Sequence, residues 1–303
     1  MIEGQEGVTW QDWLALAGAV EDSPLDGLFR SDHYTAFHGN VEGALDAWST
    51  VTALAAVTRR IRLGTLVSPV GFRHPSLLAR QVASADRISG GRVELGIGTG
   101  WHAGEHAGNG FDFPDLGTRF EVLGEQLEIL VNSWTREQFD FQGRHYTLAG
   151  QRAAPRPVQV PHPPIVMGGA AKARSLALAA RYASEYNVAL RPLADLPGLR
   201  VRLDAACTAA GRDPATLALS LMLTPAIGRT DGEARARKDR ALARIPNSGP
   251  HIGGLMFTGT VPALVEHLRG AARAGVTRAY LQHMDFTDLE AVKLMGEVAA
   301  ALA

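Results

Sequence analysis

An aspartate and a histidine stand side by side at the end of a predicted strand that begins at Gly27. Consecutive polar groups are costly on a buried strand unless they reach a functional site. Histidine changes charge near neutral pH, so His33 could move protons, with Asp32 orienting it. Neighbouring strand residues point to opposite sides, however, so Asp32 could instead hold a loop. A helix cap or a purely structural hydrogen bond is the other interpretation of the pair.

Glycines follow a second predicted strand in the run Gly98-Thr99-Gly100-Trp101. Glycine at such positions lets the backbone approach a ligand closely. Residues 98–103 also fit the dinucleotide fingerprint G-x-G-x-x-A. That fingerprint needs a helix start to hold a pyrophosphate, and the glycines at 104, 108 and 110 predict that no helix follows. We therefore expect a ligand pocket here rather than a dinucleotide site.

His102, Glu105 and His106 match the inverted zinc-protease pattern H-x-x-E-H. Zinc would need both histidines on one face of a stable helix, together with a further ligand. The surrounding glycines predict that this helix does not form, so we expect no metal site. A role in a cofactor or substrate pocket and a plain loop structure both stay open.

The run Gly168-Gly169-Ala170 leads directly from a predicted strand into a predicted helix. Free backbone amides at the helix start, the positive end of the helix dipole and the nearby Lys172 favour an anion. This is the best phosphate-binding candidate in the chain, with a tight turn as the alternative.

Residues 68–75 could form a wall beside an aromatic ligand or only a loop. His283 could face the pocket or cap the last helix.

The elements that must position these residues alternate along the chain. The predicted strands cover residues 27–31, 62–67, 93–97, 164–167, 185–188, 217–223 and 278–282. The predicted helices cover residues 10–20, 44–58, 75–88, 118–133, 172–182, 196–210 and 261–274. This alternation predicts parallel strands with helical crossovers. With a stub at residues 1–3, it gives the strand number of a (β/α)8 TIM barrel.

An open doubly wound sheet is the alternative fold. Residues 134–163 and 228–259 look like insertions, and the first contains a predicted hairpin at 139–146. We expect the whole chain, 1–303, to form a single domain.

Composition excludes several classes of protein. With 30 basic and 31 acidic residues the formal net charge is −1, so no broad basic field exists for nucleic acid. No apolar run approaches the ~20 residues that span a bilayer. The first five residues have neither the basic start nor the apolar region of a signal peptide. The single cysteine, Cys207, excludes an internal disulfide. We therefore expect a cytoplasmic protein.

Together these segments resemble the bacterial luciferase-like oxidoreductases, which are TIM-barrel enzymes that use flavins or deazaflavins. The resemblance runs from Gly4 to the C-terminus. It is carried by residues 26–34, 62–75, 92–106, 166–171 and 258–262, in that order. It is strongest to the branch that uses coenzyme F420, an 8-hydroxy-5-deazaflavin.

The resemblance implies a role for each segment. Asp32 and His33 would lie beside the deazaflavin ring. A bulge, often with a non-prolyl cis peptide, would back the ring, and glycine-rich turns would border the pocket and bind the phosphate. The cofactor-binding residues implied in this way are Leu66, Val67, Ser68, Gly98, Thr99, Gly100, Trp101, Gly168, Gly169 and Ala170.

The resemblance also implies an activity, namely hydride transfer between F420 and a small organic substrate, with His33 as the proton-transfer residue. An FMN-dependent monooxygenase is the alternative, and a non-catalytic flavin-binding protein is a lesser one. The family usually pairs into homodimers through helices near the second and third strands. Here Val51, Leu54 and Ala55 are expected to offer the apolar face.

Two departures from the family pattern matter. The first strand looks truncated, which would leave an exposed seam in the barrel. The sugar-phosphate dehydrogenases of the family carry a tryptophan and a glutamate where this chain has Phe37 and Trp101. Glucose-6-phosphate is therefore not the expected substrate.

Overall fold

The computed structural model describes residues 1–37, 44–152, 154–246 and 249–303. Its strands are β1 (Gly27–Arg30), β2 (Arg62–Thr65), β3 (Ser68–Pro69), β4 (Val93–Gly98), β5 (Gln138–Gln142), β6 (Thr147–Arg152), β7 (Ile165–Gly168), β8 (Glu185–Ala189), β9 (Ala218–Leu223), β10 (Pro225–Gly228), β11 (Phe257–Thr260) and β12 (Arg278–Leu281). Its helices are α1 (Trp10–Glu21), α2 (Ala47–Val57), α3 (Pro75–Ser89), α4 (Ala103–Gly108), α5 (Leu116–Thr135), α6 (Ala173–Tyr182), α7 (Leu196–Ala209), α8 (Asp231–Arg244), α9 (Gly249–Leu255), α10 (Val261–Arg273) and α11 (Leu289–Leu302).

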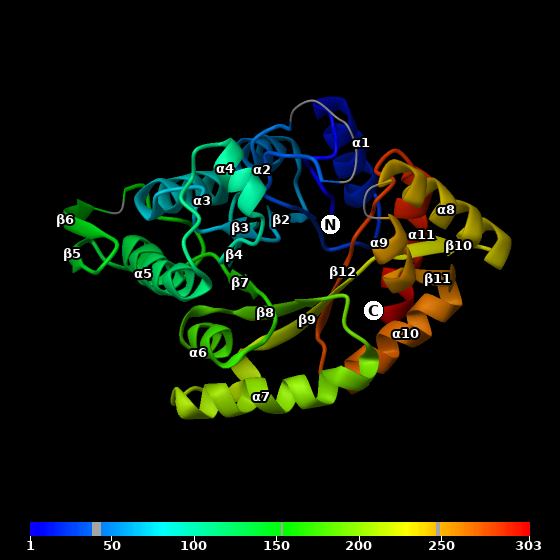
Figure 1. Ribbon diagram of the computed structural model, residues 1–303. Coiled ribbons are helices and arrows are strands. Elements are labelled where there is room, and N and C mark those ends of the chain that lie inside the picture. The colour runs from blue at the N-terminus through cyan, green and yellow to red at the C-terminus, as the bar shows by residue number, and fades with distance from the viewer. Residues whose placement is uncertain (38–43, 153, 247–248) are drawn as a thin grey trace.

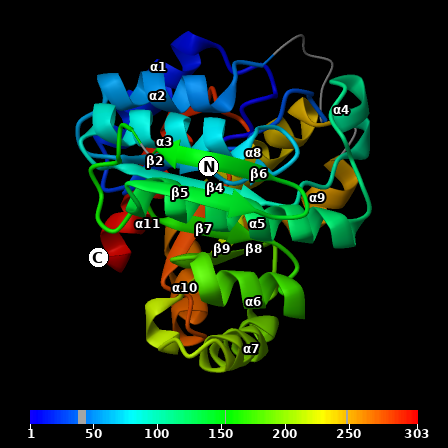
Figure 2. The same ribbon diagram turned by 90° about the vertical axis from the view of Figure 1, so that its left-hand side faces the viewer.

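A curled parallel sheet forms the centre of the molecule, and helices lie around its outside (Figures 1 and 2). Its strands pair in the order β1-β2-β4-β7-β8-β9-β12, with β3 beside β4. Every one of these pairs is parallel. Parallel neighbours need long crossover connections, which the helices supply. The predicted parallel α/β architecture is confirmed.

Closure into a complete eight-stranded barrel is not confirmed. β1 and β12 stand at the two ends of the strand order and do not pair with each other. Two residues at the start of the chain reach both of them instead. Ile2 bridges to Arg30 in parallel, and the backbone amide of His283 donates to the carbonyl oxygen of Met1 at 2.9 Å.

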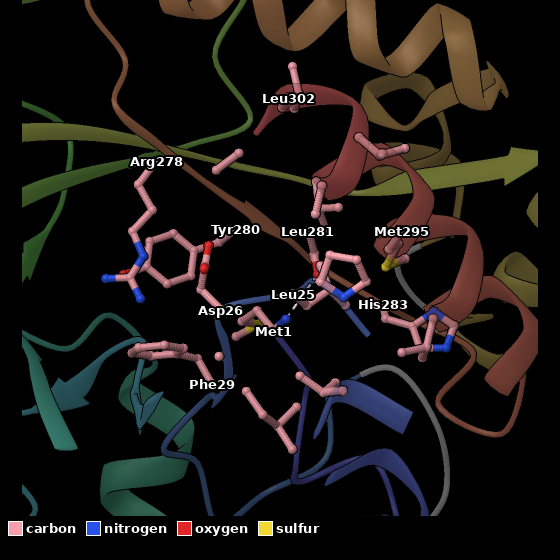
Figure 3. Close-up of a pocket in the computed structure, with 18 of the residues that line it drawn as sticks. Met1, Leu25, Asp26, Phe29, Arg278, Tyr280, Leu281, His283, Met295 and Leu302 are labelled. Atoms are coloured by element: carbon pink, nitrogen blue, oxygen red, sulfur yellow. Dashed lines mark hydrogen bonds between the residues drawn. The ribbon is translucent and has the colours of Figure 1, made fainter. Parts of the chain in front are cut away.

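Beside this bridge, a groove of about 480 Å³ separates β1 from β12 (Figure 3). The Met1 amino group donates to the carbonyl oxygen of Leu281 at 2.9 Å. The Arg278 guanidinium lies over the rings of Phe29 and Tyr280, 4.9 and 4.8 Å from their centroids. The groove is the seam that the short first strand predicts.

The hairpin predicted within residues 134–163 is confirmed as the antiparallel pair β5 and β6, which projects from one side of the molecule (Figure 1). The second predicted insertion contains α8 and α9, flanked by the parallel pair β10 and β11. Residue 153 and residues 247–248 of these two segments lie outside the described residues.

The outer helices pack on the sheet through apolar faces. In α1, Thr9 and Asp12 form the predicted capping box, and Trp13, Leu16 and Val20 are buried. The apolar face predicted on α2 serves the same purpose: Val51, Leu54 and Ala55 are each at most 2% exposed. The expectation that these three residues form a dimer interface is therefore wrong, because the chain's own core covers them. No described helix is long and apolar enough to cross a membrane.

Two buried groups beside the groove should make stability depend on pH. Burial lowers the pKa of the Met1 amino group to about 5 and that of His283 to about 4. The unfolded chain, with ordinary pKa values of 8.0 and 6.5, takes up protons at higher pH than the folded protein does. The unfolded state therefore binds more protons, so the stabilisation is complete above pH 8 and is lost as the pH falls toward 4.

We expect the free energy of unfolding to fall by about 1.4 kcal/mol per pH unit for each titrating group. Between pH 8 and 6.5 only the Met1 amino group contributes to the fall in the free energy of unfolding. Below pH 6.5 His283 also contributes. Urea unfolding at several pH values between 8 and 5 measures this pH dependence of the free energy of unfolding. In the control, His283→Gln, the extra slope below pH 6.5 should disappear. Equal stability at pH 8 and pH 5 in the unchanged protein would contradict this account.

Candidate active site

A pocket of about 570 Å³ opens at the carboxyl ends of the parallel strands. In barrel-type folds this face carries the functional groups. The structure brings most of the predicted site residues together here; they are His33, Leu66, Val67, Gly98, Thr99, Gly100, Trp101, Gly168, Gly169 and Ala170. Asp32 and Ser68 do not line the pocket.

The floor of the pocket is built from Val67 and two glycines. The peptide bond between Leu66 and Val67 is cis, as the resemblance implied. A Cβ added at Gly98 or at Gly168 would lie 3.0 or 3.3 Å from a Val67 methyl carbon. Larger residues at either glycine would therefore displace Val67 or fill the pocket. The floor stays open for a flat ligand because these positions have no side chains.

Glu105 is the carboxylate that holds His33. Its Oε2 lies 2.7 Å from His33 Nδ1, and its Oε1 accepts hydrogen bonds from the backbone amides of Tyr34 and Thr35 at 2.6 and 3.0 Å. Burial alone would raise the pKa of Glu105, but the hydrogen bonds from His33 and the two amides outweigh it, so the pKa is lowered. An ionised Glu105 keeps a proton on Nδ1 and leaves Nε2 as the exchangeable nitrogen.

His33 Nε2 makes no hydrogen bond within the described part of the chain, and the ring borders the pocket. The side chain of His33 is 11% exposed. Its ring packs edge-on against Phe37, with centroids 4.5 Å apart, and against Trp101 at 5.9 Å. The packing and the bond to Glu105 fix the ring while one nitrogen remains available to a ligand.

The prediction that no helix follows the Gly-x-Gly turn is wrong, because α4 spans Ala103–Gly108. Two polar contacts outweigh the poor helix propensity of its glycines. His102 Nδ1 accepts from the backbone amide of Glu105 at 2.8 Å and so caps the helix start. Asn109 Nδ2 donates to the carbonyl oxygen of Glu105 at 2.8 Å.

The H-x-x-E-H residues have separate tasks. His102 caps α4 and Glu105 holds His33, while His106 Nδ1 lies 3.0 Å from the carbonyl oxygen of His102. Among the residues that the structure describes, no group of three His, Cys, Asp or Glu side chains is arranged to hold a metal ion.

Asp32 does not touch His33. It is fully buried, and its carboxylate accepts from Ser68 Oγ at 2.6 Å and from Arg73 Nη1 and Nη2 at 2.5 and 3.2 Å. Arg73 also pairs with Asp46, the residue that caps α2. The idea that Asp32 orients His33 is therefore wrong, and its alternative, that Asp32 holds a loop, describes what is seen. Asp32 and Ser68 support the pocket wall from behind.

The predicted phosphate site lies just before a helix whose start no side chain caps. The N-cap of α6, Lys172, offers no side-chain hydrogen bond to the first turn of that helix. Gly169 and Ala170 are exposed at the pocket edge. The amide of Gly169 donates to the carbonyl oxygen of Asn187 at 3.4 Å, and the amide of Ala171 donates to Tyr186 Oη at 2.9 Å. A helix start without a capping side chain is suited to an anion.

Sequence reasoning missed several residues of the pocket. Glu3, Asn187, Arg191, Met222 and Gln282 also line it. All except Glu3 lie within or just after a strand of the sheet, so reading the residues at every strand end would have found them. His283 does not face this pocket; it borders the groove, and its Nε2 lies 3.2 Å from the carbonyl oxygen of Asp288 at the start of α11.

Ala170→Asp tests the phosphate site without disturbing the core, since Ala170 is exposed. We expect the variant to fold normally and to bind a phosphate-bearing cofactor about 10- to 100-fold more weakly. That range corresponds to roughly 1.4–2.8 kcal/mol of repulsion between the introduced carboxylate and the phosphate. Fluorescence titration measures the affinity, with the neutral Ala170→Asn as the control. Equal affinity in all three proteins would place the phosphate elsewhere.

Comparison with known proteins agrees with this geometry. The sequence matches the luciferase-like monooxygenase family over residues 2–283. The chain therefore belongs to that family, whose members include F420-dependent and flavin-dependent oxidoreductases.

Among individual relatives, an uncharacterized protein of Mycobacterium tuberculosis is 34% identical over 183 residues, 60% of this chain and 63% of that protein. Pyrimidine monooxygenase RutA of Stutzerimonas stutzeri is 32% identical over 207 residues, 65% of this chain and 54% of RutA. The matches thus cover less than two thirds of either relative.

A solved F420-dependent secondary alcohol dehydrogenase, in complex with an F420-acetone adduct, resembles the whole fold. The TM-score is 0.82 at 17% identity, covering 97% of this chain and 95% of that chain. At this level of identity the likeness concerns the fold.

Proposed function

We propose that this protein is an F420-dependent oxidoreductase that transfers a hydride between the deazaflavin and a small organic substrate. One observation carries the proposal: a glycine-floored pocket at the strand ends has a histidine on its edge whose Nδ1 is held by a buried carboxylate. The full-length structural likeness to an F420-dependent alcohol dehydrogenase supports this cofactor.

The residues of the pocket fit a ring system with a phosphate tail. Gly98 and Gly168 leave space where a Cβ would press on Val67, and a flat ring needs that space. The turn at Gly169 and Ala170, just before the uncapped start of α6, would hold the phosphate. When bound, F420 supplies hydride chemistry at its C5 atom. His33 would hold or accept the proton at Nε2, and Glu105 would keep Nδ1 protonated.

An FMN-dependent monooxygenase remains the second candidate, because RutA, a monooxygenase by name, is a relative of this chain. Titrating the purified protein with F420, FMN and riboflavin, and following ring fluorescence, separates the two. Tight binding of F420 and weak binding of FMN would support the first candidate, and the reverse would support the monooxygenase. No binding of any of the three would contradict both.

A cytoplasmic homodimer is part of the proposal. Since the face predicted on α2 is buried, the pairing surface would use the exposed apolar side chains Val57, Leu77 and Ile88 on α2 and α3. Sedimentation that shows only monomers at all working concentrations would contradict it.

A further inference from the structure

A second pocket, of about 850 Å³, lies beside the candidate active site. Its walls come from the loop after β3, from α4 and the loop that follows it, from the first turns of α5 and from the turn of the β5–β6 hairpin. These elements lie on the side of the molecule from which the hairpin projects (Figure 1). Thr99 lines both pockets, whereas His33 and the turn Gly168-Gly169-Ala170 line only the first.

Aromatic rings form the apolar lining of this second pocket, which we call the aromatic pocket. They belong to Phe72, Phe111 and Phe113. Phe72 is 6% exposed, and its ring centroid lies 5.3 Å from that of Phe111. Phe111 and Phe113 are only partly buried. Because aromatic rings favour offset or edge-on contacts with other rings, these two side chains suit a flat aromatic ligand.

Arg119, on α5, brings a positive charge to the aromatic pocket without a carboxylate that pairs with it. Its guanidinium lies 3.9 Å from the centroid of the Phe113 ring, and its Nη1 donates to the carbonyl oxygen of Gly100 at 2.6 Å. Its Nε is buried and donates to no described group. Burial lowers the pKa of Arg119, and Asp115, the acid that opposes this shift, is occupied as the cap of α5. A bound carboxylate would supply the acceptor that the buried N–H group lacks.

His106, on α4, presents an unused acceptor to the aromatic pocket. It is 1% exposed, and its Nδ1 lies 3.0 Å from the carbonyl oxygen of His102. Because a carbonyl oxygen can only accept, Nδ1 carries a proton, and Nε2 is the acceptor of the neutral ring. This Nε2 makes no hydrogen bond with any residue in the described ranges. A Cβ added at Gly71 would lie 2.9 Å from Nε2, so the missing side chain at Gly71 keeps this nitrogen open.

Other polar groups of the aromatic pocket leave room for an anion. Tyr146 Oη accepts from Gln126 Nε2 at 2.8 Å, and the hydroxyl proton has no acceptor among the described residues. Arg73 is already balanced by two aspartates. Asp112, the acidic side chain among the described lining residues, is exposed, so solvent and salt screen its charge. An anion in the pocket would therefore be attracted mainly by Arg119.

The aromatic pocket borders both elements that support the active site. Glu105, which holds His33, and His106 are consecutive residues of α4. Arg119 holds the carbonyl oxygen of Gly100, a residue that lines the first pocket. A ligand in contact with His106 and Arg119 would therefore lie against the supports of the active-site histidine and of the glycine turn.

We propose that the aromatic pocket is a second binding site, separate from the cofactor pocket, for a planar aromatic carboxylate. The ring of the ligand would lie against Phe111 and Phe113, and its carboxylate would bind Arg119. A hydroxyl or N–H group on the ring would donate to His106 Nε2. The site goes beyond the proposed function and does not depend on which cofactor the first pocket holds.

Titration calorimetry of the purified full chain with benzoate, benzamide and cyclohexanecarboxylate tests the proposal. Benzamide keeps the flat ring of benzoate but has no charge, and cyclohexanecarboxylate keeps the charge but has no flat ring. We expect benzoate to bind at least ~10-fold more tightly than either, because the pocket offers both a cation and aromatic rings. If benzoate binds no more tightly than either comparison compound, or does not bind, the proposal is overturned.

Two variants locate the binding. Val122→Trp places a bulky ring in the aromatic pocket from α5 and should weaken benzoate binding at least ~10-fold. Its matched control, Val201→Trp, makes the same change on the exposed surface of α7, outside both pockets, and should leave the affinity unchanged. Arg119→Gln should weaken benzoate about 10- to 100-fold and benzamide much less, and it tests the site even if Val122→Trp does not fold. Unchanged benzoate affinity in either folded variant would place the acid elsewhere and overturn the proposal.

Discussion

Replacing His33 by alanine is expected to slow turnover by ~10²–10⁴-fold, or about 3–5 kcal/mol of activation free energy. Hydride transfer changes the charge on the substrate atom, so a positioned proton donor or acceptor lowers the barrier. His33 Nε2 is the pocket nitrogen free for this task, since Glu105 occupies Nδ1. Cofactor affinity should change much less, because the pocket floor and the glycine turns would make most of the contacts with a bound cofactor ring.

Single-turnover reduction or oxidation of the bound cofactor, with a substrate found by screening, measures the chemical step. Glu105→Gln provides the matched variant, because it keeps the size of the side chain and an acceptor for the amides of Tyr34 and Thr35. It lets His33 take the other tautomer, so we expect a loss of about 10- to 100-fold. If His33→Ala weakens cofactor binding while the chemical step survives, His33 only packs against the ring.

Replacing Asp32 by alanine is expected to lower the free energy of unfolding by about 3 kcal/mol, near the low end for a broken buried ion pair. The change leaves Arg73, which is 9% exposed, with Asp46 as its remaining carboxylate. Urea unfolding measures the loss. Ser68→Ala removes one hydrogen bond to the same carboxylate and leaves the buried indole N–H of Trp48 without its acceptor. It should therefore cost about 2 kcal/mol, still less than Asp32→Ala.

Asp32→Ala also shows whether Asp32 only supports the pocket wall or takes part in catalysis. Because Asp32 does not line the pocket, the folded fraction of Asp32→Ala should keep most of its cofactor affinity and single-turnover rate. An Asp32→Ala protein of unchanged stability that fails in the chemical step would show that the carboxylate acts on the reaction.

The parts of the site that the sequence predicted are those set by local chain geometry. Gly98 and Gly168 stand at the ends of apolar strands, where the absence of a Cβ leaves the strand end open toward a ligand. Strand ends on one edge of a parallel sheet converge, so these turns had to meet. The alternation of strand and helix likewise fixed the parallel sheet.

Local sequence patterns could not identify Glu105 as the hydrogen-bond partner of His33. Glu105 lies 72 residues further along the chain and belongs to a helix that its glycines disfavour. The helix forms because His102 and Asn109 satisfy its ends and Glu105 binds the backbone after β1, all of which are tertiary or capping contacts. Sequence adjacency alone suggests that Asp32 contacts the His33 side chain. Its true partner, Arg73, comes from a different loop.

The groove between β1 and β12 gives the protein a natural site for circular permutation. Met1 and Ala303 both line it, and α11 follows β12, so a linker running from Ala303 to Met1 would lie between the two open strand edges. An extended linker would pair with both edges and continue the direction in which Met1 and Ile2 already run parallel to β1. In such a rearranged chain, the covalent link between the old ends would itself become a strand of the sheet.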